Sequence, residues 1–138
     1  MKKIVMLLLL PKLFLACSVD EIPTFSFETL PVANVLSVPD TFVVGEIASI
    51  DISYLRPSTC HSFEGIQLEP ETTTNINIAV LARLVEGRAP CTDLSNEEVT
   101  VPIAFNPLEP GEVTLNFLTG TDAEGQPTFI TFNVPVIE

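Results

Sequence analysis

The chain has 138 residues, with 18 acidic residues against 6 basic ones, and all three lysines stand before residue 17. If the first 16 residues are removed, as argued below, 122 residues remain with three arginines as their only bases, and 3 − 18 gives a net charge of −15. Such a polyanion is a poor ligand for nucleic acid or for an acidic membrane surface, because phosphate contacts need clustered lysine and arginine. A chain of this length suits one domain with one modest core. Composition therefore excludes two classes of partner without indicating an activity.

The first 17 residues have the order of an export signal. Lys2 and Lys3 precede the apolar run 4–10, and a second apolar run, 13–16, leads directly to Cys17. Both runs are too short for a membrane-spanning helix, which needs roughly 20 apolar residues. We therefore expect the segment to be cleaved after export. The alternative is an uncleaved and buried hydrophobic N-terminus.

A small residue directly before a cysteine resembles the lipobox of bacterial lipoproteins, here Leu15, Ala16 and Cys17. The resemblance implies that residues 1–16 are a lipoprotein signal peptide and that Cys17 becomes the first residue of the mature protein and carries the lipid. The acidic residues at 20–21 resemble the surface-export signal of Bacteroidota lipoproteins, with a solvated acidic tether as the alternative. We therefore expect a lipid anchor in the outer membrane, on a side that the sequence leaves open.

Residues 17–31 are expected to form the lipidated cysteine and an acidic tether, in which the alternating Phe25 and Phe27 indicate either linker or a short edge strand. From residue 32 to residue 138, hydrophobic residues alternate with polar ones between prolines and glycines. This pattern predicts an all-β domain of seven or eight strands with very little helix, typical of an antiparallel β-sandwich of immunoglobulin-like architecture. The segments that alternate most clearly are 32–38, 47–55, 61–68, 76–84, 99–105, 113–117 and 128–136.

Single residues within these segments predict local features. Gly65 predicts a β-bulge, and Pro102 predicts an edge strand or a bulge because it cannot donate to a sheet. Alternation places Tyr54 on the apolar face of its strand and Ser53 on the opposite, polar face. Residues 119–127 are expected to form a polar loop.

Two cysteines remain once Cys17 is assigned to the lipid. Cys60 and Cys91 are then an even pair in an oxidising compartment, where a disulfide is the expected state. If successive strands run up and down, both cysteines lie in loops at the same end of the domain. The chain-entropy model gives such a link about 3 to 4 kcal/mol. The competing use is metal ligation by Cys60 and His61 together with Cys91, but their spacing differs from that of known zinc motifs.

The run from Tyr54 through Pro57, Cys60 and Phe63 to Cys91, with His61 next to Cys60, is similar to a recurrent pattern in small uncharacterised lipoproteins of the Bacteroidota. The resemblance covers most of the mature domain and implies a structural role for these residues without an activity. The immunoglobulin family itself is not matched, since the chain has no tryptophan to pack on an inter-sheet disulfide.

Any serine-histidine-acid arrangement must use His61, the only histidine, with Ser58, Ser62 and Asp51 nearby in the sequence. Nearness along a strand or loop does not make a triad, and the chain lacks the GxSxG motif of a nucleophile elbow. We therefore expect no catalytic residues and no enzyme. His61 is expected instead to cap or order the loop beside the disulfide.

The acidic residues offer two further ligand hypotheses. Glu64, Glu69 and Glu71 fit a solvated face better than the carboxylate pair of a glycosidase. Asp122 and Glu124 are candidate calcium ligands in a loop, although the twelve-residue calcium-loop pattern is missing. A solvated hairpin turn is the alternative for this loop, and no other metal or cofactor is expected.

These observations favour a non-enzymatic, lipid-anchored lipoprotein of the cell envelope, whose β-sandwich has a structural role or contacts an envelope protein or glycan. The alternative is a calcium- or carbohydrate-binding module that is accessory to an envelope enzyme or transporter. Nucleic acid is not expected as a partner, and the sequence does not indicate an oligomeric state.

Overall fold

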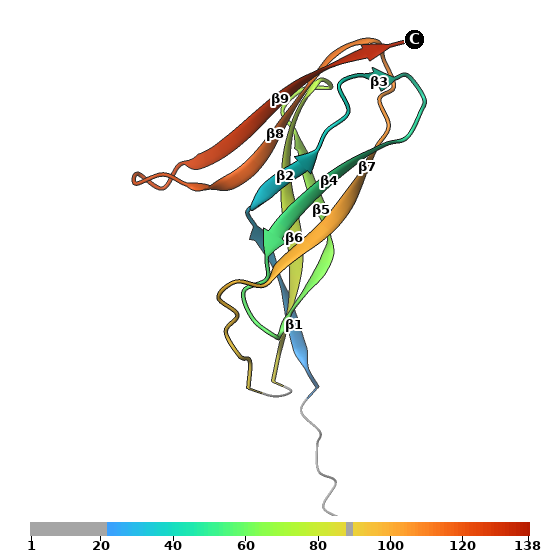
Figure 1. The fold of residues 1–138 in the computed structure, drawn as a ribbon. Helices are drawn as coiled ribbons and strands as arrows, with labels where there is room; N and C mark the ends of the chain where they lie inside the picture. Colours follow the sequence, from blue (N-terminus) through green and yellow to red (C-terminus); the bar gives the residue numbers. More distant parts are fainter. Residues whose placement is uncertain (1–21, 88–89) are drawn as a thin grey trace, which may run out of the picture.

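The computed structural model describes residues 22–87 and 90–138. The predicted signal peptide and the predicted lipidation site, Cys17, lie outside the described residues. Within them the fold is all-β, with no helix and with nine strands (Figure 1). The strands are β1 (Thr24–Leu30), β2 (Asn34–Ser37), β3 (Phe42–Val43), β4 (Ala48–Leu55), β5 (His61–Pro70), β6 (Asn75–Glu86), β7 (Glu98–Phe105), β8 (Gly111–Thr121) and β9 (Pro127–Ile137).

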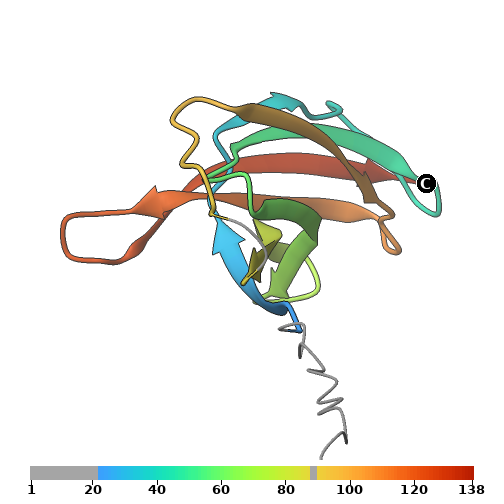
Figure 2. The same ribbon diagram turned by 90° about the horizontal axis from the view of Figure 1, so that it is seen from below.

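The strands form two sheets. The larger sheet has the order β1-β6-β8-β9-β3, with β5 paired to the other side of β6, and the smaller sheet has the order β2-β4-β7. Figure 2 shows the smaller sheet as a layer along one side of the molecule, facing strands of the larger one. In both views the end of the β8–β9 hairpin extends away from the rest of the domain.

The core lies where the apolar faces of these two sheets meet, because alternating residues of each strand point to one face. The smaller sheet contributes Ile50, Ile52, Tyr54, Val101 and Ile103, and the larger sheet contributes Ile78, Val80, Ala82, Val113, Leu115, Phe117, Val134 and Val136. The predicted apolar face of β4 is therefore confirmed.

Two local predictions are confirmed by the pairing. The register between β5 and β6 shifts between Phe63 and Gly65, which is the predicted bulge. Pro102 lies opposite Asp51 in β7, and β7 pairs only with β4, so the proline occupies an edge strand.

Three expectations are refined or corrected by the strand pairing. Of the two interpretations of Phe25 and Phe27, the edge strand is the correct one, because Thr24–Leu30 pair residue by residue with 80–86 of β6 and β1 lies at the end of the strand order. The tether predicted over 17–31 therefore overlaps a strand from Thr24 onward. Not all strands are antiparallel either, since β6 pairs in parallel with β8 and β3 pairs in parallel with β9. The polar loop expected over 119–127 is shorter than predicted, because β8 continues to Thr121 and β9 begins at Pro127.

The described residues form nine strands where seven or eight were expected, and β1 and the two-residue β3 lie outside the seven segments that alternate most clearly. In the described part of the chain, no helix is long and apolar enough to cross a membrane.

Leu115 is fully buried on β8 between the paired residues Ile76 and Phe132. Leu115→Ala is expected to lower the free energy of unfolding by about 2 to 5 kcal/mol, because it removes buried methyl groups and leaves a cavity. Urea unfolding measures this loss. Leu108→Ala, at a side chain that is 78% exposed, is the control and should change stability by less than about 0.5 kcal/mol; equal losses would contradict the core assignment.

Candidate functional site

The cysteines predicted to pair do form a disulfide. Cys60 lies in the loop between β4 and β5, Cys91 lies in the loop between β6 and β7, and their Cα atoms are 5.4 Å apart. The two loops are also joined by backbone hydrogen bonds, from the Thr59 amide to the Thr92 carbonyl at 3.0 Å and from the Leu94 amide to the Pro57 carbonyl at 2.9 Å. The disulfide therefore joins two loops at one end of the domain, as expected from the sequence.

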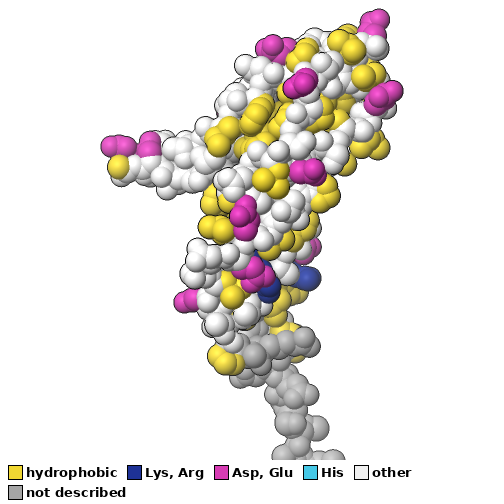
Figure 3. Space-filling model, viewed as in Figure 1, with side chains coloured by type: hydrophobic (Ala, Val, Ile, Leu, Met, Phe, Trp, Pro, Cys, Tyr) yellow, Lys and Arg dark blue, Asp and Glu magenta, His cyan; other side chains and the backbone are white. Residues whose placement is uncertain are grey.

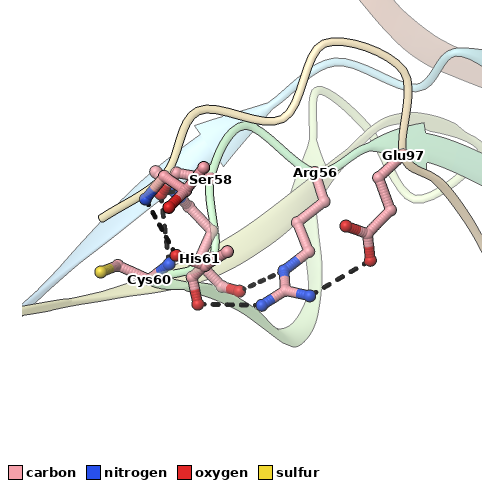
Figure 4. Close-up of polar contacts among 7 residues, drawn as sticks. Arg56, Ser58, Cys60, His61 and Glu97 are labelled. Carbon is pink, nitrogen blue, oxygen red and sulfur yellow. Dashed lines mark hydrogen bonds and ion pairs between the residues drawn. The ribbon is translucent and has the colours of Figure 1, made fainter. Parts of the chain in front are cut away.

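Arg56 braces this end of the domain. Its guanidinium donates to the carbonyl oxygens of His61 at 2.7 Å and Thr59 at 2.9 Å, and it pairs with Glu97 at 3.2 Å (Figure 4). The side chain thus ties the loop that contains Cys60 to the start of β7. Burial raises the pKa of the nearby Tyr54 phenol, and the positive charge of Arg56 opposes that rise.

Ser58, His61 and Glu28 form a line of hydrogen bonds. Ser58 Oγ lies 2.7 Å from His61 Nδ1, and His61 Nε2 lies 3.0 Å from Glu28 Oε2 on β1. These partners fit the neutral histidine with its proton on Nε2, which donates to the carboxylate while Nδ1 accepts from the serine hydroxyl. Ser58 Oγ also accepts a hydrogen bond from the backbone amide of Cys60 at 3.2 Å. His61 therefore orders the disulfide loop and links it to β1.

This line has the composition of a catalytic triad but not its accessibility. Ser58 is 4% exposed, whereas the carboxylate-bearing side chain of Glu28 is 44% exposed. In a catalytic triad the nucleophile must be accessible to substrate, and the acid that orients the histidine is normally buried. Here the exposures of the serine and the acid are the reverse of that. The other sequence candidates lie apart from it: Ser62 Oγ donates to the Arg83 carbonyl, and Asp51 lies on β4 of the other sheet.

The neighbouring acids Glu64, Glu69 and Glu71 are not brought together as a pair. Glu64 lies 3.6 Å from Arg83, Glu69 accepts from Gln67, and Glu71 accepts from two asparagines of β6. Each carboxylate thus has a separate partner on the exposed side of the larger sheet.

The candidate calcium ligands lie in the β8–β9 hairpin. Asp122 Oδ1 accepts the backbone amides of Glu124 at 3.0 Å and Gln126 at 2.8 Å, and Gly125 has a φ of 80°, which favours glycine. Asp122 therefore closes the hairpin turn through Oδ1. Among residues 22–87 and 90–138, no group of three or more histidine, cysteine, aspartate or glutamate side chains is arranged to hold a metal ion.

A polar cluster on the smaller sheet was not expected from the sequence. Ser53 was predicted on the outer, polar face of β4, yet it is fully buried, and its hydroxyl donates a hydrogen bond to the Glu98 carboxylate of β7. Glu98 also accepts from Asn34 Nδ2 on β2 at 2.8 Å. Hydrogen bonds from Ser53 and Asn34 lower the pKa of Glu98, since they stabilise the charged carboxylate.

A second feature missed by the sequence analysis is a groove on the outer face of the larger sheet. One edge of β6 pairs with β1 over 80–86 and with β8 over 75–78, so the sheet forks at Ala79. The groove at this position has a volume of about 210 Å³ and extends from Gln67 on β5 to Phe129 on β9. We call it the fork groove. The sequence carries no local signal for it, because the groove arises from the order in which β1 and β8 join β6.

Comparison of the chain with family models, with curated proteins and with solved structures finds no match in any of the three.

The disulfide predicts a large effect on stability. The double variant Cys60→Ala/Cys91→Ala should lose about 3 to 4 kcal/mol of unfolding free energy, because the loop closed by cysteines 31 residues apart becomes free in the unfolded chain. Urea unfolding with and without dithiothreitol measures this, and the reductant should destabilise only the wild type. Alkylation of Cys60 and Cys91 in folded, unreduced protein would contradict the link.

The lowered pKa of Glu98 predicts an acid-dependent loss of stability. The pKa of Glu98 in the folded state lies below its value in the unfolded state. The ionised carboxylate therefore makes its full contribution to stability above the unfolded-state pKa, and this contribution is lost as the pH falls through the folded-state pKa. Ser53→Ala removes the main donor and should move the Glu98 pKa upward, as followed by NMR titration of its carboxyl carbon. Glu98→Gln should lose less stability than wild type on going from about pH 7 to about pH 3. Parallel pH profiles for the two proteins would contradict this assignment.

Proposed function

We propose that the chain is a non-enzymatic, lipid-anchored lipoprotein of a bacterial cell envelope, held at the outer membrane and displayed there as an interaction module. The observation that carries the proposal is the order of the N-terminal residues, with Lys2 and Lys3, an apolar run and Ala16 directly before Cys17. The disulfide between Cys60 and Cys91 supports it, because such links persist in oxidising compartments outside the cytosol.

The position of β1 bears on how the domain is held. If Cys17 carries the lipid, residues 17–23 separate it from the first strand, which begins at Thr24. Seven residues span at most about 25 Å when fully extended, so the domain stays close to the bilayer. Ile22, Phe25 and Phe27 at this end are 85%, 62% and 53% exposed. An apolar surface of this kind suits the boundary of a membrane better than free solvent.

Two observations support a non-enzymatic module. The Ser58–His61–Glu28 line buries its serine and exposes its acid, so it is built to order a loop. Both described arginines are paired with glutamates, Arg56 with Glu97 and Arg83 with Glu64, which leaves no unpaired arginine in the described residues to bind an anionic substrate. We propose an envelope protein or a glycan as the class of partner.

We further propose an immunoglobulin-like arrangement for the β-sandwich. Two sheets that share one apolar core support it, as does the predominance of antiparallel pairs. The disulfide differs from that of antibody domains, because it joins two loops at one end instead of crossing between the sheets.

Replacement of Cys17 tests the anchor. Cys17→Ser should move the protein from the membrane fraction to the soluble fraction, because the residue that would carry the lipid is lost. Fractionation followed by immunoblotting measures this, and intact mass should show a lipid adduct on the wild type only. Ser18→Ala is the control and should stay with the membrane. A Cys17→Ser protein that remains in the membrane fraction would overturn the proposal.

A further inference from the structure

The fork groove arises from the pairing of β6 and not from a loose surface loop. Its base is Ala79, which is only 7% exposed although it lies on the outer face of the sheet. At this residue β1 has ended on one edge of β6, and β8 joins the same edge one residue earlier, at Ile78. The Val32 amide donates to the Leu118 carbonyl at 2.7 Å and so holds the chain leaving β1 against β8. The walls of the groove are therefore strands, and the site is preformed.

One wall of the fork groove is polar and ordered. Thr29 Oγ1 donates to Gln67 Oε1 at 2.6 Å, and Gln67 Nε2 donates to Glu69 Oε1 at 2.6 Å. Asn77 is held by Asn116, whose amide donates to Asn77 Oδ1 at 3.0 Å. A side-chain amide has two N–H donors, and the two oxygens of a carboxylate together have about four lone-pair sites. Gln67 and Glu69 can therefore form further hydrogen bonds. This wall can both donate to and accept from a ligand at fixed positions.

The opposite wall is apolar. Leu118 and Phe129 are paired across β8 and β9, so both side chains lie on the same outer face of the sheet. The Phe129 ring is 38% exposed and lines the groove. A ligand in the groove thus meets hydrogen-bonding groups on one side and an aromatic ring on the other.

We infer that the fork groove binds one neutral sugar ring, such as the exposed unit of an envelope or extracellular glycan. A sugar ring has hydroxyl groups on its rim and C–H groups on its faces, and it therefore matches a polar wall opposite an aromatic one. The volume of about 210 Å³ lies below the roughly 300 to 1,000 Å³ of pockets for drug-sized ligands, which suits a single ring.

Charge restricts the class of sugar. Glu69 lies in the polar wall, and the chain as a whole has 18 acidic residues against 6 basic ones. A sugar that carries a carboxylate or a sulfate would be repelled. The inference deepens the proposed function by naming the partner as a glycan. It is tested on purified protein, so its failure would leave the membrane-anchoring result unaffected.

Saturation-transfer NMR on the purified full chain in mild detergent tests the site. The probes are methyl glycosides of glucose, galactose, mannose, N-acetylglucosamine, fucose and rhamnose at about 10 mM, which is above a weak Kd of about 1 mM. At least one should show transfer, whereas methyl glucuronide should not. Absence of transfer from all six neutral glycosides, or equal transfer to the glucuronide, would overturn the inference.

Two substitutions locate the binding. Phe129→Ala removes the aromatic wall and should weaken binding about tenfold. Ala79→Leu fills the base of the groove and should abolish transfer. Phe63→Ala is the matched control, because its ring is 39% exposed but packs against Tyr54 away from the groove. Circular dichroism and melting curves confirm folding of each variant. Equal loss in Phe63→Ala and Phe129→Ala would overturn the assignment to the groove.

Discussion

The larger sheet depends on one strand, β6, which pairs with three others. Its one edge is filled by β5, and its other edge is shared by β1 and β8 in succession. β9 pairs with β8 and β3 pairs with β9, so the remaining strands of this sheet are positioned through β8. β1 and β8 run in opposite directions along the same edge of β6, and the sheet opens between them at the point where pairing with β1 ends and pairing with β8 begins. The fork groove is the direct consequence of that pairing.

Much of the fold follows from local patterns that report which face of a strand is buried. Alternation identified the strands that form the core, because period two is a property of each strand alone. Gly65 and Pro102 predicted a bulge and an edge for a similar reason, since each changes the backbone of its own strand. The disulfide was predictable because the two cysteines of the domain follow strands that end on the same side.

What the sequence did not reveal depends on partners distant in the chain. The sequence leaves Phe25 and Phe27 open between linker and edge strand, and only the pairing of β1 with 80–86 of β6 decides between the two. Ser53 has the alternation of a solvent-facing residue, yet it is fully buried on the central strand of the smaller sheet and donates to Glu98 of β7. Parallel pairing and the groove have no local signal, because both arise from the order in which strands join the sheet.

The structure shows where the acidic side chains lie on the surface. Carboxylates are spread along the length of the face shown in Figure 3, and the tip of the β8–β9 hairpin carries them as well. Each described arginine forms an ion pair with a glutamate, so the positive charge of each is offset within the domain. The long-range field therefore remains negative over the domain, and it disfavours anionic ligands in any hollow of this surface. Neutral ligands are not subject to that repulsion, and the proposed binding of a neutral sugar therefore depends on the shape and hydrogen-bonding groups of the fork groove.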